Sequence, residues 1–167
     1  MHPAMMDEAA LLKQCQMGKG RGSGPGGQHR NKVETLVWIV HTPSGLETHA
    51  GERRSAAENR SVAIRRMRLI LAAKFRTGVP VGDARSDLWR SRCSPQGRIA
   101  CNPEHHDYPA LLAEAMDLVD ACGLDVKKAA ARLCCSPSQL IKLIKDHPPG
   151  LEELNRSRAE RGLHPLK

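Results

Sequence analysis

A run of apolar, largely β-branched residues, followed by turn residues and a second short run, predicts a β-hairpin in the first half of the chain. Residues 35–42 are rich in β-branched side chains and are bounded by turn residues, which is typical of a strand. Pro43, Ser44 and Gly45 supply hairpin-turn chemistry, and residues 46–50 form the returning strand. Before the hairpin, we expect a short helical turn capped by Asp7 and an edge strand near residues 14–17. These strands predict a small antiparallel sheet.

A long helix is expected after the hairpin. Ser55 and Glu58 have the spacing of a capping box, and the helical pattern continues to about Lys74. Its apolar residues return every three or four positions, as on the face of a helix that packs on a sheet. This face comprises Ala63, Ile64, Met67, Ile70 and Leu71.

The second half of the chain changes from an irregular to a helical pattern. Residues 77–106 contain scattered glycine and proline without sustained periodicity, which predicts an irregular linker, with Trp89 packing as an anchor. Residues 107–167 predict several helices, among them one through 126–133 and one that Ser136, Pro137 and Gln139 begin with a capping box. The next helix is expected over about 151–161, after Pro148, Pro149 and Gly150 break the chain. The two helices around the turn at Cys134 resemble a helix-turn-helix.

Residues 24–31 read Gly-Pro-Gly-Gly-Gln-His-Arg-Asn, a run that neither a helix nor a central strand accommodates. The stretch resembles the catalytic domain of class I peptide chain release factors, whose defining element is a Gly-Gly-Gln loop. The resemblance extends over roughly the first 75 residues, and its ordered spacing makes it specific. Its matching positions are Gly24, Gly26, Gly27, Gln28, His29, Asn31 and Thr35, followed by the 43–45 turn, Arg54, Ser55, Asn59 and Arg60.

The resemblance over roughly the first 75 residues, together with the patterns of the second half, predicts an α+β fold in three segments. Residues 1–76 form a release-factor catalytic domain, a short antiparallel sheet packed by one long helix and carrying an exposed Gly-Gly-Gln loop. Residues 77–106 form the linker, and residues 107–167 form an all-helical, helix-turn-helix-like unit. In this family, the loop enters the peptidyl-transferase centre of the ribosome and triggers hydrolysis of the peptidyl-tRNA ester.

The resemblance also implies a catalytic site at the loop. Gln28 is its central residue, and Gly26 and Gly27 shape the backbone around it. Five neighbours are expected to support the loop: Ser23, Gly24, Pro25, His29 and Asn31. We expect His29 to contact RNA or backbone rather than to act as a general base, because the chain shows no Ser-His-Asp set and no carboxylate pair near the loop. The ribosome would supply the rest of the site.

The positive charge of the chain is concentrated around this loop. The chain carries a formal net charge of +8, and residues 1–76 hold 13 Lys and Arg against 6 Asp and Glu, whereas residues 107–167 hold nine of each. A basic surface beside the loop predicts contact with RNA phosphates rather than a merely solvated face. The predicted RNA-binding residues are Arg21, Arg30, Lys32, Arg53, Arg54, Arg60, Arg65, Arg66 and Arg68.

Other features exclude several classes of protein. The chain shows no membrane-length apolar run and no targeting signal, so we expect a cytoplasmic monomer whose six cysteines stay reduced. Cys93, Cys101, His105 and His106 cluster in the sequence, but their spacing matches no common zinc pattern, so we predict no metal and no cofactor.

The sequence thus predicts a ribosome-dependent peptidyl-tRNA hydrolase that acts on ribosomal RNA and peptidyl-tRNA. Because 167 residues leave no room for a stop-codon-reading domain, the expected activity is codon-independent rescue of stalled ribosomes. One alternative is a non-catalytic ribosome- or RNA-binding protein. Another is a DNA-binding regulator that uses Ser138, Gln139, Lys142 and Lys145, which the zero net charge of residues 107–167 disfavours. We therefore do not expect DNA as a partner, and residues 107–167 are predicted to position the ribosome or dock a protein.

Overall fold

The computed structural model describes residues 1–21 and 34–167, which fold into two compact units. The sheet unit comprises Met6–Ile70, and the helical unit comprises Met1–Met5 together with Leu71–Lys167. The boundary lies within a helix, and residues 77–106 belong to the helical unit. The division into a catalytic domain, a linker and a C-terminal unit stays a prediction.

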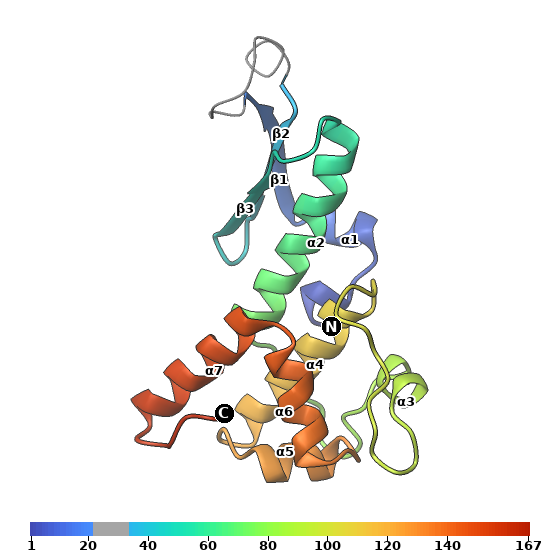
Figure 1. Ribbon diagram of the computed structural model, residues 1–167, viewed down its shortest axis with the longest axis vertical. Helices are drawn as coiled ribbons and strands as arrows, with labels where there is room; N and C mark the ends of the chain where they lie inside the picture. The colour runs from blue at the N-terminus through green and yellow to red at the C-terminus, as the bar shows by residue number, and fades with distance from the viewer. Residues whose placement is uncertain (22–33) are drawn as a thin grey trace. The chain divides into compact units, whose positions relative to one another are not determined.

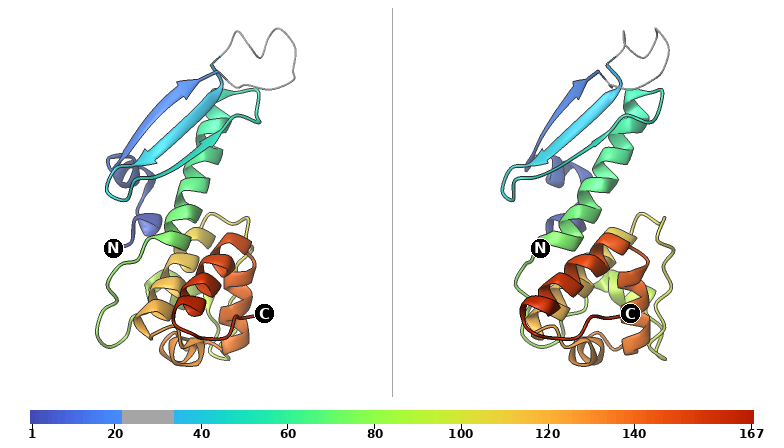
Figure 2. Two further views of the ribbon diagram at one scale, coloured as in Figure 1. Left: turned by 90° about the vertical axis from the view of Figure 1, so that its left-hand side faces the viewer. Right: turned by 60° about the vertical axis from the view of Figure 1, so that its left-hand side comes forward.

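The sheet unit contains a three-stranded antiparallel sheet in the order β1-β2-β3. Its elements are α1 (Glu8–Leu12), β1 (Cys15–Gly20), β2 (Leu36–His41), β3 (Leu46–Ala50) and the first part of α2 (Ala56–Lys74). Asp7 caps α1 as expected, because its side chain accepts a hydrogen bond from the Ala10 N–H. Residues 56–70 of α2 run along the sheet (Figure 1; Figure 2). The predicted α+β fold, with a short sheet beside one long helix, is confirmed.

Alternate residues of β2 build the core of the sheet unit. Val37 and Ile39 are each 1% exposed, whereas Trp38 between them is 38% exposed. The long helix contributes the opposing apolar face, as its periodicity predicts. The buried apolar residues of the sheet unit are Leu11, Val37, Ile39, Ala50, Ala63, Ile64 and Met67.

A buried histidine fixes the β2–β3 turn. His41 is fully buried, with its Nδ1 2.7 Å from Ser44 Oγ and its Nε2 3.1 Å from Gln14 Oε1. Burial lowers the pKa of His41. The neutral ring therefore joins the turn to the residue that precedes β1.

The helical unit packs around α4. Its elements are η1 (Pro3–Met5), α3 (Asp87–Arg92), α4 (Tyr108–Ala121), α5 (Val126–Arg132), α6 (Pro137–Lys145) and α7 (Pro148–Glu160). Two aromatic side chains tie the core together through their polar atoms. Trp89 Nε1–H donates to the Leu133 carbonyl at 2.9 Å, and the Tyr108 hydroxyl donates to the Leu143 carbonyl at 2.7 Å. Trp89 is completely buried, so the predicted anchor is confirmed.

The stretch predicted to be irregular contains the helix α3. Ser86 caps it by accepting from the Trp89 N–H at 3.0 Å, and the buried carboxylate of Glu114 accepts from both the N–H and the hydroxyl of Ser86. Burial raises the pKa of Glu114, while the bonds from Ser86 oppose this shift. The helix is short and depends on a tertiary partner, so no periodicity in the sequence could reveal it.

Two predicted details of the C-terminal helices are wrong. The Gln139 side chain accepts from the Ile99 N–H at 3.2 Å instead of completing a capping box with Ser136. The Ser136 N–H donates to the Gly97 carbonyl, and a Cβ on Gly97 would lie 3.1 Å from backbone atoms of residues 135 and 136. Pro148 and Pro149 begin α7 instead of breaking the chain before it, because proline is compatible with the first turn of a helix.

No helix among the described residues is both long and apolar enough to cross a bilayer.

Candidate functional site at the loop end of the sheet

The sheet defines where the glycine-rich segment leaves and returns. Gly20, the last residue of β1, pairs with Leu36, the first residue of β2. Just beyond this pair, Arg21 Nε lies 3.9 Å from Glu34 Oε1. Because Gly20 and Leu36 are paired, the segment 22–33 connects the last residue of β1 to the first residue of β2 at one end of the strand ladder. We call this end of the sheet the loop end.

The predicted catalytic residues belong to this segment. Gly26, Gly27 and Gln28 occupy its middle in the sequence. Their roles stay predictions because they lie outside the described residues, as do those of their predicted neighbours. These neighbours are Ser23, Gly24, Pro25, His29, Arg30, Asn31 and Lys32.

A buried asparagine clamps the loop end. Asn59, on the first turn of α2, is completely buried. Its Nδ2 donates to the carbonyls of Thr35 at 2.7 Å and Arg53 at 3.0 Å, and its Oδ1 accepts from the Arg53 N–H at 2.9 Å. One side-chain amide thereby joins the entry to β2, the β3–α2 connection and the helix. Asn59 is part of the family resemblance, but nothing in the sequence pattern assigned it this role.

Arg53 and Arg54 are the most available of the predicted RNA-binding residues. Both are exposed, and neither guanidinium has a partner among the described residues. Their connection follows Ala50, which pairs with Val37 near the loop end of the sheet. Asn59 holds the backbone of Arg53 in place, so these two cations stand on a fixed support.

Two predicted cations on α2 are engaged with acidic residues of their own unit. Arg60 contacts Glu8 at 2.8 Å, and Arg66 contacts Glu52 at 2.5 Å while also donating to the His49 carbonyl. Bonds from the backbone N–H groups of Glu52 and Gly51, together with that from Arg66, lower the pKa of Glu52.

Arg65 and Arg68 are partly covered. Burial lowers the pKa of Arg68, while the nearby charges of Glu8 and Asp7 oppose this shift. The structure therefore separates two freely presented arginines, Arg53 and Arg54, from a paired or partly covered group on α2.

Comparison with known proteins identifies the domain that carries this site. Residues 12–86 match the family described as the RF-1 domain. The chain is 33% identical over 131 residues to peptide chain release factor 1 of Acidiphilium cryptum, covering 70% of this chain and 37% of that protein. It is 36% identical over 132 residues to peptide chain release factor 1 of Granulibacter bethesdensis, covering 68% of this chain and 36% of that protein. Residues 12–86 therefore form an RF-1 domain, and over this region the chain is similar to class I peptide chain release factors.

The chain spans little more than a third of the length of these release factors. The matched RF-1 domain includes all the described residues at the loop end as well as the segment 22–33. The predicted resemblance to this family is thus confirmed.

Outside the loop end, the cysteines and histidines of residues 93–106 do not gather into one site. His105, His106 and Asp107 bring their ligand atoms within 4.8 Å of one another, but neither Cys93 nor Cys101 belongs to this group. Asp107 also accepts from Arg92 at 2.6 Å. A guanidinium on the carboxylate opposes a cation there.

The helix-turn-helix of this release-factor relative presents few free polar groups. The turn between α5 and α6 places Cys134 at φ +52°, the conformation in which glycine is common. Of the four residues considered for DNA contact, Gln139 binds the backbone of Ile99, and Lys142 pairs with Asp146 at 2.8 Å. Ser138 and Lys145 are exposed. Because two of the four are engaged within the unit, the structure adds no support for DNA reading.

Proposed function

We propose that the chain is a ribosome-dependent peptidyl-tRNA hydrolase that rescues stalled ribosomes without reading a stop codon. The observation that carries this proposal is the Gly26-Gly27-Gln28 triplet in the middle of a segment whose two ends the RF-1 domain holds together. A binding protein has no evident need for this triplet. The proposed substrate is the ester that joins a nascent peptide to tRNA, and the proposed site of action is the cytoplasm.

The proposed chemistry is stabilisation of an oxyanion. Attack of water on the ester carbonyl produces a tetrahedral intermediate with a negatively charged oxygen. In the proposal, the backbone N–H of Gln28 donates to this oxygen, and the Gln28 side chain orients water and excludes other nucleophiles. Gly26 and Gly27 lack a Cβ, so the backbone can approach the ester closely. The ribosome supplies the remaining contacts, as the lack of a catalytic triad in the sequence requires.

Positioning on the ribosome is assigned to the basic sheet unit. Residues 6–70 hold 11 Lys and Arg against 6 Asp and Glu. Arg53 and Arg54 are proposed as phosphate contacts at the loop end, because their guanidinium groups are exposed and free of partners among the described residues. Arg60 and Arg66 would have to break their ion pairs with Glu8 and Glu52 to bind phosphates. We therefore expect them to contribute less to ribosome affinity than Arg53 and Arg54.

Codon independence is proposed for the 167-residue chain as it stands. Its two compact units are the sheet unit with the RF-1 domain and a helical unit, and we assign neither to codon reading. The helical unit is proposed to position the factor on the ribosome or to dock a protein, and the chain is proposed to act as a monomer.

The test is release of a labelled peptide from ribosomes stalled at the end of an mRNA that lacks a stop codon. We expect release by the full chain, at a rate unaffected by adding a stop codon to the message. Ribosome binding without release would support the non-catalytic alternative. Release that requires a stop codon would contradict codon independence while preserving the hydrolase assignment.

A further inference from the structure

Trp38 differs from the other large aromatic side chains of the chain. The chain contains two Trp, one Tyr and one Phe, all of which lie in the described residues. Trp89 and Tyr108 are buried, and each donates a hydrogen bond to a backbone carbonyl. Trp38 is 38% exposed, and its indole N–H has no partner among the described residues. Trp38 is thus the tryptophan of the chain whose indole ring is presented to solvent.

The strand register places Trp38 on the open face of the sheet. Its neighbours across the ladder are Gly18 on β1 and His49 on β3. Val37 and Ile39 point to the core, so Leu36, Trp38 and Val40 share the other face of β2. This face carries an aromatic ring at its centre and polar side chains at its margins, including the exposed Gln16, Glu47 and His49.

The lack of a side chain at Gly18 allows the indole ring of Trp38 to pack against β1. A Cβ at position 18 would lie 2.3 Å from Cζ2, 2.4 Å from Cε2 and 2.7 Å from Nε1 of Trp38, closer than side chains pack. The ring therefore lies directly against the backbone of β1. This contact supports the ring on one side, and 38% of the side chain stays exposed, as a preorganised stacking surface requires.

The surroundings indicate what this surface binds. Trp38 lies two residues, about 7 Å, from the Gly20–Leu36 pair at the loop end. Asn59 links Thr35, three residues before Trp38, to Arg53 in the connection that presents the two unpaired arginines. An exposed aromatic ring near the loop end, on a unit that presents two arginines without a partner among the described residues and holds five more basic than acidic residues, is complementary to the base and phosphates of a nucleotide.

We propose that Trp38 is a stacking platform for an unpaired base of ribosomal RNA, with Arg53 and Arg54 on the neighbouring phosphates. The proposal rests on the proposed ribosomal function for the identity of the RNA. It adds a binding residue outside the Gly-Gly-Gln loop. A free indole N–H at the edge of the ring can also donate to an acceptor on the RNA.

The first experiment measures binding of the full chain to purified large ribosomal subunits. Trp38→Ala and Trp38→Leu should weaken binding roughly 5- to 100-fold, because both remove the stacking ring. Trp38→Phe should retain most of the affinity. Met17→Ala, which removes another exposed apolar side chain of the sheet unit, is the matched control and should change binding less than about twofold. Thermal unfolding of each variant checks that the sheet unit is intact.

The outcomes separate an RNA base from an apolar partner. If Trp38→Leu binds like the wild type while Trp38→Ala does not, the surface contacts an apolar group and the stacking proposal is overturned. Full binding by Trp38→Ala would also overturn it.

A second readout separates this proposal from the proposed function. The Trp38 fluorescence, obtained as the difference between wild type and Trp38→Phe, should be quenched by single-stranded oligoadenylate and not by an RNA duplex of equal charge. Quenching without peptide release would contradict the proposed function and leave the platform standing. Release without quenching or any effect of Trp38 substitution would contradict the platform alone, and the loss of both signals would overturn both proposals.

Discussion

The sheet unit and the helical unit differ in how particular arginines are paired and how their tryptophans are buried. In the helical unit, Arg76 contacts the nearly buried Asp117 at 3.2 Å, and Arg92 contacts Asp107 at 2.6 Å. In the sheet unit, Arg53 and Arg54 extend from the surface without a partner among the described residues. The two tryptophans show the same contrast, because Trp89 is fully buried whereas Trp38 is exposed.

This contrast shows why net charge has to be interpreted together with pairing. The helical unit holds 15 Lys and Arg against 12 Asp and Glu, and the sheet unit holds 11 against 6. Paired cations stabilise the fold locally and attract a polyanion weakly, since each acid cancels the field of its base. Of the sheet unit's basic residues, Arg53 and Arg54 reach the solvent near the loop end without a partner among the described residues.

The largest effect is expected from the loop itself. Gly27→Ala should slow peptide release about 100- to 1,000-fold, because a side chain at this position displaces the proposed oxyanion donor. Ribosome affinity should change less than twofold, since the basic surface is untouched. Gln28→Ala should be milder, because the backbone N–H remains. The measurements are single-turnover release and ribosome binding.

Gly78→Ala is the control for this prediction, since a Cβ at position 78 has no atom within 4 Å and the residue lies in the helical unit. If the Gly27→Ala variant released peptide as fast as the wild type, the catalytic role proposed for the Gly-Gly-Gln loop would be contradicted.

A buried ion pair should dominate the stability of the helical unit. Asp117 accepts from the N–H and hydroxyl of Thr77 and from Arg76, and its removal leaves these donors without an acceptor. Asp117→Ala should lower the free energy of unfolding by about 3 kcal/mol. Urea denaturation followed by Trp89 fluorescence in a Trp38→Phe background reports this unit. Asp120→Ala, which removes an exposed pair with Arg161, should cost less than about 0.5 kcal/mol.

The clamp at the loop end should have a smaller effect on stability and a distinct effect on function. Asn59→Ala leaves the Thr35 carbonyl and both backbone groups of Arg53 unpaired, and should cost about 2 kcal/mol. It should also slow peptide release, because the end of the loop loses its support. Trp38 fluorescence during urea denaturation measures the first effect. Ser61→Ala on the exposed side of the same helix is the control, and equal losses in both variants would argue against a clamp.

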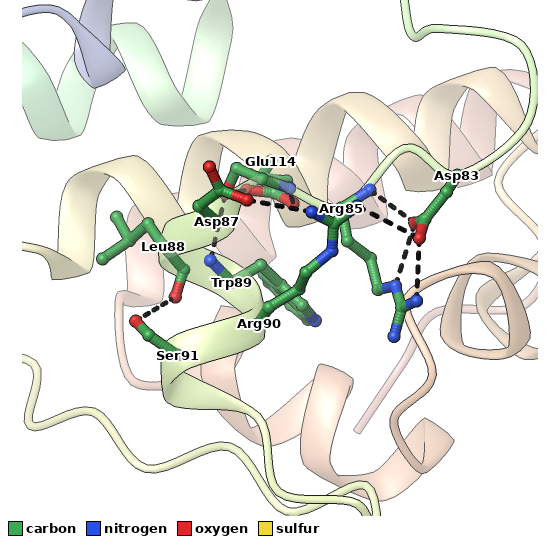
Figure 3. Close-up of polar contacts among 9 residues, drawn as sticks. Asp83, Arg85, Asp87, Leu88, Trp89, Arg90, Ser91 and Glu114 are labelled. Atoms are coloured by element: carbon green, nitrogen blue, oxygen red, sulfur yellow. Dashed lines mark hydrogen bonds and ion pairs between the residues drawn. The ribbon is translucent and has the colours of Figure 1, made fainter.

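The paired and unpaired cations can be compared directly by salt titration. Replacing both Arg53 and Arg54 by Ala should weaken ribosome binding about tenfold at low salt and reduce the slope against log salt by about two, since two phosphate contacts are lost. Replacing Arg85 and Arg90, which contact Asp83 and Asp87 in the helical unit (Figure 3), should leave the slope unchanged. Replacing Arg60 and Arg66 should reduce the slope against log salt by an amount between these two results. Equal slopes for all pairs would remove the distinction between presented and engaged arginines.

Of the predicted effects, the smallest is expected from lowering the pH, which should change the stabilities of the two units to different extents. Burial lowers the pKa of His41 in the sheet unit and of His2 in the helical unit. A histidine with a lowered folded pKa contributes its full stability above the unfolded value of about 6.5 and loses it as the pH falls.

The helical unit also contains Glu114, whose pKa burial raises, so its contribution runs in the opposite direction and is lost as the pH rises. From about pH 6.5 to 4.5, the Trp38 transition in urea should therefore shift more than the Trp89 transition. His41→Gln should flatten the response of the Trp38 transition, and an unchanged response would exclude His41 as its source.

Local chemistry made much of the fold predictable. The caps at Asp7 and Ser136, the 43–45 turn and the β-branched run that forms β2 depend on residues close in the sequence, and each appears in the structure as expected. The Gly-Gly-Gln pattern and its spacing also sufficed to identify the family. The caps and the turn can be predicted from the sequence because backbone geometry and hydrogen bonds over three or four residues produce them.

The remaining features required contacts between distant residues. The side-chain amide of Asn59 has the same chemistry in a loop, a cap or a clamp, and only the approach of Thr35 and Arg53 makes it a clamp. Likewise, Gln139 follows its capping serine at the right spacing but binds Ile99, because a distant turn occupies the helix start. The sequence by itself determined the family, the main elements and the charge of each half. The tertiary structure decided which cations are paired, which tryptophan is exposed and what holds the loop end, since burial and pairing depend on the neighbours that folding brings together.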